Sequence, residues 1–170
     1  MVSYVVFGRG SFNQLDEILT PHRKGDAPMV FLVDHFFEGK ALLNRIPLRG
    51  KDKIVLADVT YEPKTTQVDA LARSLKEEFG MISGVIGIGG GSTMDLAKAV
   101  SLMMTNPGSS ADYQGWDLVQ VPGVYKVTLK RRSQHEQDTD STTARKKVLS
   151  SLRALHRLKG QRRSVLPSYK

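Results

Sequence analysis

The sequence predicts an α/β fold of the Rossmann type, a parallel sheet with helices on both faces. Over residues 1–125, short apolar runs alternate with segments whose apolar residues recur at helical spacing. The strand-like runs are almost continuously apolar, which is typical of parallel strands that are covered on both faces. One run leads into three consecutive glycines and then into a helical pattern, the order in which a nucleotide-binding strand meets its helix.

The first elements follow one another in a regular order. A short β-type run at residues 4–7 precedes a helical pattern that Ser11 can cap. A buried strand over residues 29–33 ends at Asp34. Residues 36–46 are expected to hold a short helix. The succession of strand and helix predicts that the strands lie parallel.

The same alternation continues toward the glycines. A strand is expected over residues 53–59, followed by a helix that opens near Thr66 and ends at Gly80, a glycine suited to a helix C-terminus. The next strand covers residues 85–88. It leads into the glycine loop without an intervening polar segment.

The glycine loop supplies the candidate cofactor-binding residues Gly89, Gly90, Gly91 and Ser92. Bare backbone N–H groups and the positive end of a helix dipole meet there, an arrangement that favours a pyrophosphate. Ser92 and Asp95 have the spacing of a capping box for the helix. Its buried face is expected to carry Leu96, Ala97, Val100, Met103 and Met104. The alternative is a tight turn that binds nothing.

The run from Gly89 to Lys98 resembles the nucleotide loop of the iron-containing alcohol dehydrogenases. Three further segments match that family in order, at residues 6–11, at residues 31–34, and at residues 105–108 with 112–117. The resemblance implies an oxidoreductase that passes hydride between a small alcohol and NAD or NADP, with a bound iron or zinc. In their residues, the segments are most similar to the branch of the family that oxidises the terminal hydroxyl of 3-deoxy-manno-octulosonate.

Two acidic residues are further candidates for cofactor binding. Asp34 ends a buried strand, where its carboxylate can accept hydrogen bonds from ribose hydroxyls; the alternative is a plain turn-forming role. The resemblance places Asp95 near the nicotinamide end of the site, which is compatible with a capping role. Tyr113 and Trp116 either line a pocket or anchor their loop to the core.

The chain departs from the family after Val127, where the expected Gly-Thr-Gly segment is missing. The family's metal ligands belong to a second domain, which we expect to be absent. The four histidines, His22, His35, His135 and His156, are too far apart in sequence to suggest a metal site. We therefore expect lone surface histidines, no metal ligands and no catalytic residues in this chain.

Charge separates the chain into an expected dinucleotide-binding domain, residues 1–125, and a basic, poorly packed extension, residues 126–170. The extension holds 13 of the 25 Lys and Arg residues but only 3 of the 17 Asp and Glu residues. A shift of reading frame near Val127 would explain the change, and reading the other frames of the gene tests it. We expect a fragment of a dehydrogenase that has no turnover alone.

Composition narrows the remaining alternatives. The chain has no cysteine, and no apolar run is long enough to span a bilayer, so a cytoplasmic location is expected. Two other functions stay open: a noncatalytic nucleotide-binding module, and an interaction protein that uses its basic extension. No specific nucleic acid is predicted as a partner, and the oligomeric state is left open.

Overall fold

The structure, a computed structural model of the 170-residue chain, describes residues 6, 8, 10–115 and 118–130. All of these lie in one compact unit of the chain. The expected strand at residues 4–7 lies outside the described residues except for Val6, and Trp116 and most of the expected basic extension also lie outside them.

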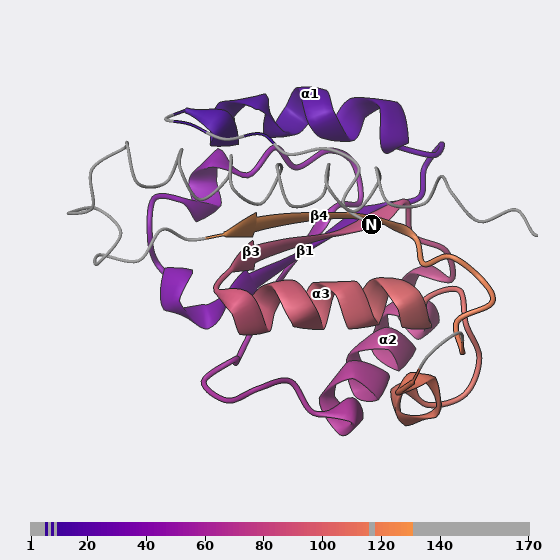
Figure 1. The fold of residues 1–170 in the computed structure, drawn as a ribbon. Helices are drawn as coiled ribbons and strands as arrows, with labels where there is room; N and C mark the ends of the chain where they lie inside the picture. Colours follow the sequence, from indigo (N-terminus) through magenta and orange to yellow (C-terminus); the bar gives the residue numbers. More distant parts are fainter. Residues whose placement is uncertain (1–5, 7, 9, 116–117, 131–170) are drawn as a thin grey trace, which may run out of the picture. The chain divides into compact units, whose positions relative to one another are not determined.

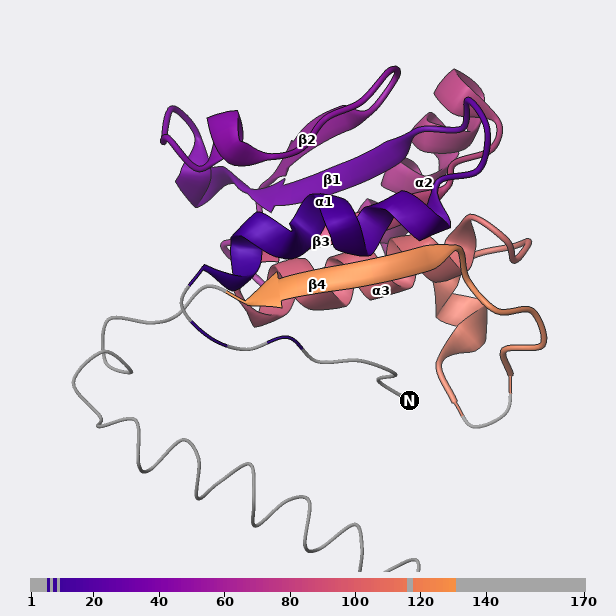
Figure 2. The ribbon, with the colours of Figure 1, turned by 90° about the horizontal axis from the view of Figure 1, so that it is seen from above.

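A parallel sheet of four strands forms the centre of the described unit (Figures 1 and 2). The strands are β1 (Met29–Asp34), β2 (Lys53–Ala57), β3 (Gly84–Gly89) and β4 (Tyr125–Lys130). Their order across the sheet is β2-β1-β3-β4, and every neighbouring pair is parallel. The predicted Rossmann-like fold is therefore confirmed.

Helices cover both faces of the sheet (Figure 1). On one face lies α1 (Leu15–Leu19), which is extended at its ends by the 3-10 turns η1 (Ser11–Gln14) and η2 (Thr20–His22). The other face carries α2 (Thr65–Phe79) and α3 (Gly91–Met103). Each helix turns an apolar stripe toward the sheet, which is what gives an amphipathic segment its stability in a fold.

One expected helix is replaced by shorter turns. Within residues 36–46 the structure has two 3-10 turns, η3 (His35–Phe37) and η4 (Leu43–Arg45), in place of the short helix. Between them Gly39 takes a φ of +68°, a left-handed conformation that interrupts a helix. A further 3-10 turn, η5 (Ser110–Tyr113), follows α3.

The core lies in two layers, one on each side of the sheet. Alternate residues of β1 point to opposite faces, as the pleat requires. Val30 and Leu32 join the α2 and α3 side, whereas Met29, Phe31 and Val33 join the α1 side. All five are fully buried, which explains why this strand is continuously apolar in the sequence.

β4 is a strand that the sequence pattern did not reveal. It pairs with β3 along its whole length, from Tyr125 opposite Gly84 to Lys130 opposite Gly89. Only one of its faces packs on the core, through Tyr125, Val127 and Leu129 on the α1 side. Because exposed Lys126 and Thr128 alternate with these residues, the run lacks the continuous apolar character of β1.

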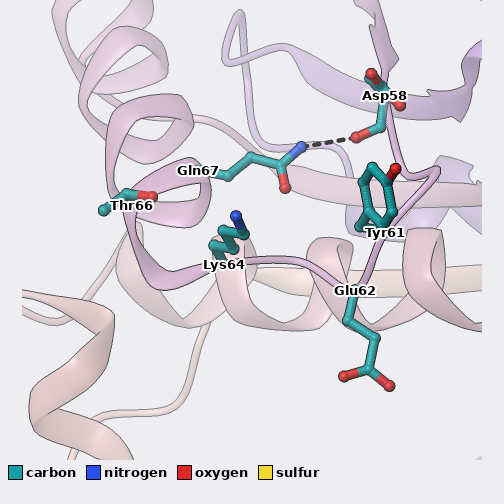
Figure 3. Close-up of a pocket in the computed structure, with 6 residues that line it drawn as sticks. All are labelled: Asp58, Tyr61, Glu62, Lys64, Thr66 and Gln67. Carbon is teal, nitrogen blue, oxygen red and sulfur yellow. Dashed lines mark hydrogen bonds between the residues drawn. The ribbon is translucent and has the colours of Figure 1, made fainter.

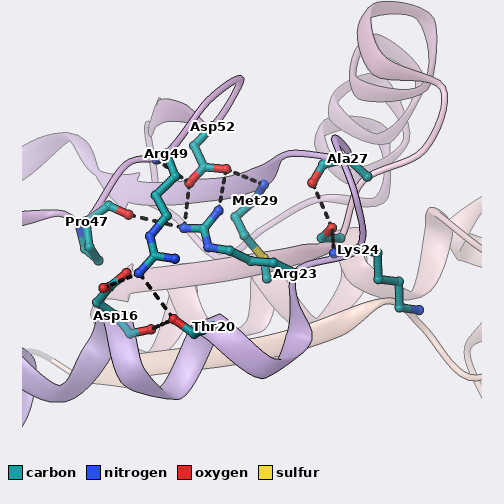
Figure 4. Close-up of polar contacts among 10 residues, drawn as sticks. Asp16, Thr20, Arg23, Lys24, Ala27, Met29, Pro47, Arg49 and Asp52 are labelled. Carbon is teal, nitrogen blue, oxygen red and sulfur yellow. Dashed lines mark hydrogen bonds and ion pairs between the residues drawn. The ribbon is translucent and has the colours of Figure 1, made fainter.

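A buried ion pair anchors the segment between η2 and β1 (Figure 4). The Asp52 carboxylate, 1% exposed, contacts the Arg23 guanidinium at 2.8 Å and 3.0 Å. It also accepts hydrogen bonds from the backbone N–H groups of Met29 at 2.8 Å and Arg49 at 2.9 Å. Arg23 in turn donates to the carbonyl of Pro47 at 3.3 Å. One carboxylate therefore joins three segments of the chain at the start of the sheet.

Candidate functional site

The site lies at the carboxyl ends of β1 and β3, where the chain order across the sheet reverses. From β1 the chain passes to β2 on one side, and from β2 it returns through α2 to β3 on the other side. Such a switch point is where open α/β sheets bind ligands. Asp34 and Gly89 end these two strands. A Cβ on Gly89 would stand 2.8 Å from the Cβ of Asp34, so the structure brings both predicted residues together.

The first turn of α3 presents unpaired backbone donors at this point. The helix begins at Gly91, with Gly90 as its N-cap residue. The first-turn N–H groups of Gly91, Ser92 and Thr93 find no acceptor among the described residues. Their donors and the helix dipole together favour an anion.

The predicted capping box is wrong. No side chain caps α3, because the helix starts one residue before Ser92 and places that serine inside the first turn. Asp95 instead pairs with Lys98, its carboxylate 2.8 Å from the ammonium group, on the exposed side of the helix. The buried face is as predicted: Leu96, Ala97, Val100 and Met103 are buried and Met104 packs against them.

The glycines of the loop divide into two kinds. A Cβ on Gly87 would stand 2.7 Å from the Cβ of Ala97, and one on Gly89 would stand 2.3 Å from Oγ1 of Thr93, so packing of β3 against α3 requires both. Gly90 and Gly91 differ, since a Cβ on either would meet no described atom within 4 Å. Neither has a positive φ. The fold therefore does not require glycine at positions 90 and 91.

Thr93 is a feature of the site that the sequence analysis missed. Its side chain is fully buried, and its Oγ1 has no hydrogen-bond partner among the described residues. An unpaired buried hydroxyl is costly and rare in folded proteins. It lies against Gly89, beside Asp34. In the sequence, the position of Thr93 directly after Ser92 is what could have indicated that it belongs to the site.

Asp34 performs the turn-forming role that was one of its two expected functions. Its Oδ1 accepts a hydrogen bond of 2.9 Å from the N–H of Phe36 and thereby starts η3. The Asp34 side chain is 17% exposed. Its other oxygen, Oδ2, has no hydrogen-bond partner among the described residues. The turn role thus leaves one carboxylate oxygen available.

A hollow lies beside the carboxyl end of β2, between that strand and the start of α2 (Figure 3). Gln67 donates to the backbone carbonyl of Asp58 at 2.9 Å across it, and Tyr61 stands there 81% exposed. Hydrogen bonds from the hydroxyl and N–H of Thr60 hold the pKa of Asp58 below its ordinary value. The hollow is lined by Asp58, Tyr61, Glu62, Lys64, Thr66 and Gln67.

Of the two described histidines, His35 is exposed, as expected, whereas His22 is partly buried, and each contacts other groups of the chain. The ring of His22 stacks on Tyr125, with centroids 3.5 Å apart. His35 lies at the end of β1, where its Nδ1 is 3.3 Å from the carbonyl oxygen of Ala57. In the sequence, the position of His35 directly after Asp34 is what could have indicated that it lies near the site. His135 and His156 lie outside the described residues.

Potential metal ligands do not cluster in the part of the chain that the structure describes. No three His, Cys, Asp or Glu residues gather there in a way that fits a metal ion. None of the described helices has the length and apolar character needed to cross a bilayer.

Tyr113 donates to the carbonyl of Pro107 at 2.6 Å, which makes it an anchor of its loop.

Known proteins resemble this chain over the same region. A profile described as iron-containing alcohol dehydrogenase matches residues 3–133. NAD-dependent methanol dehydrogenase of Bacillus methanolicus is 29% identical over 128 residues, covering 73% of this chain and 32% of that protein. Long-chain-alcohol dehydrogenase 1 of Geobacillus thermodenitrificans is 33% identical over 134 residues, covering 74% of this chain and 33% of that protein.

A solved structure agrees in fold. Sulfoacetaldehyde reductase from Bifidobacterium kashiwanohense, crystallised with NAD+, matches with a TM-score of 0.57 at 24% identity. The match covers 76% of this chain and 36% of that one. The chain spans about a third of the length of the curated relatives that it matches.

Proposed function

This chain belongs to the iron-containing alcohol dehydrogenase family, and on that premise we propose that its described residues form the dinucleotide-binding part of an alcohol oxidoreductase. The observation that carries the proposal is the open space at Gly90 and Gly91. Glycine there is explained neither by packing nor by backbone conformation. A ligand that approaches the backbone closely, as a pyrophosphate does, explains it.

Each candidate residue has a distinct part in this proposal. The N–H groups of Gly91 and Ser92 would hold the pyrophosphate, with Gly89 and Gly90 allowing its approach. Asp34 would accept a hydrogen bond from the adenosine ribose through its available Oδ2. Exposed Asp95 lies about one helical turn farther along α3, and we keep its proposed place toward the nicotinamide.

We propose NAD as the cofactor rather than NADP. A carboxylate at the ribose repels a 2′-phosphate and accepts a hydrogen bond from a 2′-hydroxyl, and we propose this part for Asp34. The names of two similar proteins, an NAD-dependent dehydrogenase and a reductase in complex with NAD+, support the same choice. When bound, the nicotinamide supplies the hydride chemistry of the reaction.

Valine at position 90 or 91 is expected to weaken NAD binding by about tenfold or more, because its side chain would occupy the space of the pyrophosphate. Stability should change by no more than about 0.5 kcal/mol, since neither position is crowded. Isothermal titration calorimetry of the full chain with NAD, NADP and ATP measures the first effect, and urea unfolding measures the second.

Ala70→Val, on the exposed side of α2, is the matched control for binding: it should leave the NAD affinity unchanged and cost only about 0.5 kcal/mol of stability through its lower helix propensity. If Gly90→Val and Gly91→Val left the NAD affinity unaltered, the result would support the alternative that the loop is a turn that binds nothing. Equal affinity for ATP and NAD would instead favour a noncatalytic nucleotide-binding module.

The proposed substrate is a small alcohol, and by resemblance of the motifs a sugar acid such as 3-deoxy-manno-octulosonate. We expect the 170-residue chain to bind NAD without alcohol-dependent turnover. Absorbance at the wavelength of NADH, recorded with this sugar acid and with simple primary alcohols, tests the expectation. Any alcohol-dependent reduction of NAD by the purified chain would contradict it.

A further inference from the structure

His35 lies among three oxygen atoms at the carboxyl ends of β1 and β2. Its Nδ1 is 3.3 Å from the carbonyl oxygen of Ala57 and 3.5 Å from Oδ1 of Asp34. The Oδ1 atom of Asp58 follows at 3.8 Å. Ala57 is the register partner of Asp34 in the neighbouring strand, so the ring connects two strand ends that the backbone brings side by side.

These neighbours determine which ring nitrogen of His35 carries hydrogen. All three surrounding atoms are acceptors, and a bare lone pair on Nδ1 would face only other lone pairs. Nδ1 therefore bears the proton and donates to Ala57, the nearest of the three. Nδ1 is also within 3.8 Å of the carboxylates of Asp34 and Asp58, so its N–H dipole attracts both of them.

The Asp34 carboxylate is oriented from one side only. The N–H of Phe36 binds its Oδ1 at 2.9 Å, and Nδ1 of His35 faces the same oxygen. Gly89 lies against its Cβ. The hydrogen bond from Phe36 and the nearby Nδ1–H dipole of His35, whose hydrogen is donated to Ala57, hold Oδ1 on this side and leave Oδ2 for another donor.

We propose that His35 is a positioning residue, which holds Asp34 so that Oδ2 accepts a hydrogen bond from the 2′-hydroxyl of the adenosine ribose. This inference rests on the proposed dinucleotide site and adds a residue that acts on the ligand through Asp34. The half-exposed ring itself contacts no ligand in this arrangement. It fixes the acceptor before the ligand arrives, and such preorganisation contributes to affinity because less ordering is needed on binding.

The test compares two ligands that differ in one hydroxyl group, ADP and 2′-deoxy-ADP. Calorimetry of the full chain should show that it binds ADP about tenfold more tightly, the effect of one charge-assisted hydrogen bond. His35→Leu should reduce this preference to about twofold or less and leave the affinity for 2′-deoxy-ADP unchanged. His35→Asn should retain the preference, because its amide N–H group lies near the place of Nδ1.

Asp34→Ala, which removes both carboxylate oxygens, is the reference for complete loss of the contact and should bind both nucleotides alike. A purely structural role of His35 predicts that His35→Leu weakens both ligands equally, and this result would overturn the inference. So would an unchanged preference in His35→Leu, or a wild-type chain that binds both ligands equally well. If the wild-type chain binds neither nucleotide, the proposed function itself fails.

Discussion

Replacing Asp52 with alanine is expected to lower the free energy of unfolding by about 3–5 kcal/mol, the usual cost of removing one partner from a buried ion pair. Asp52 is 1% exposed and the Arg23 side chain is 16% exposed. Without the carboxylate, Arg23 keeps a charge in a mostly buried place, and the N–H groups of Met29 and Arg49 lose their acceptor. Urea unfolding followed by circular dichroism measures the loss.

The ion pair between Arg49 and Asp16 provides a matched comparison, because its side chains are 48% and 42% exposed. Asp16→Ala should cost no more than about 1 kcal/mol, as is usual for exposed pairs. Replacing Arg23 and Asp52 together by methionine and leucine should cost less than Asp52→Ala, since no buried charge then remains. A loss below about 1 kcal/mol in Asp52→Ala would show that Arg23 finds solvent or another partner.

The same carboxylate gives stability a defined dependence on pH. Burial acts to raise the pKa of Asp52, but hydrogen bonds from Arg23, Met29 and Arg49, with the Arg23 charge, outweigh it and lower the pKa below 3.8. The unfolded chain therefore binds a proton at higher pH than the folded chain does. The contribution is complete above the unfolded pKa and is lost as pH falls through the folded pKa. Asp52→Asn should lose this part of the acid dependence.

Local pattern predicted much of the fold because the strands that matter most are uniformly buried. β1 and β3 are apolar almost throughout, and they end at a carboxylate and at glycines, respectively. The sequence therefore predicted both that they are strands and where they end. β4 was not, because one of its faces is exposed and carries Lys126 and Thr128. The pairing of Arg23 with Asp52 joins residues 29 positions apart, and only the tertiary fold brings them together.

In the candidate site, too, some features could be predicted from the sequence and others depend on the tertiary fold. That Asp34 and the glycines lie at one edge followed from parallel strands, but their direct contact depends on β1 and β3 being neighbours. The contact of His35 with the end of β2 depends likewise on strand order. The capping box failed for a local reason, since α3 begins at Gly91 and leaves Ser92 inside the helix.

Replacing Gly87 with alanine is expected to lower the free energy of unfolding by about 2–3 kcal/mol, because the new methyl group overpacks the contact between β3 and α3. It would stand 2.7 Å from the Cβ of Ala97 and 3.3 Å from the carbonyl oxygen of Thr93. Neither atom can rotate away, since one is fixed to the helix backbone and the other belongs to it. Urea unfolding measures the loss, and Gly91→Ala, which adds a methyl group in open space, is the matched control.

A second substitution separates this clash from a general intolerance of side chains in β3. Ala97→Gly removes the methyl group that Gly87→Ala would meet, at its own cost of about 1 kcal/mol for glycine inside a helix. If contact between the two methyl groups causes the loss, the double variant should be more stable than the two single losses predict, by about 1–2 kcal/mol. Strict additivity would place the strain elsewhere, at the Thr93 carbonyl.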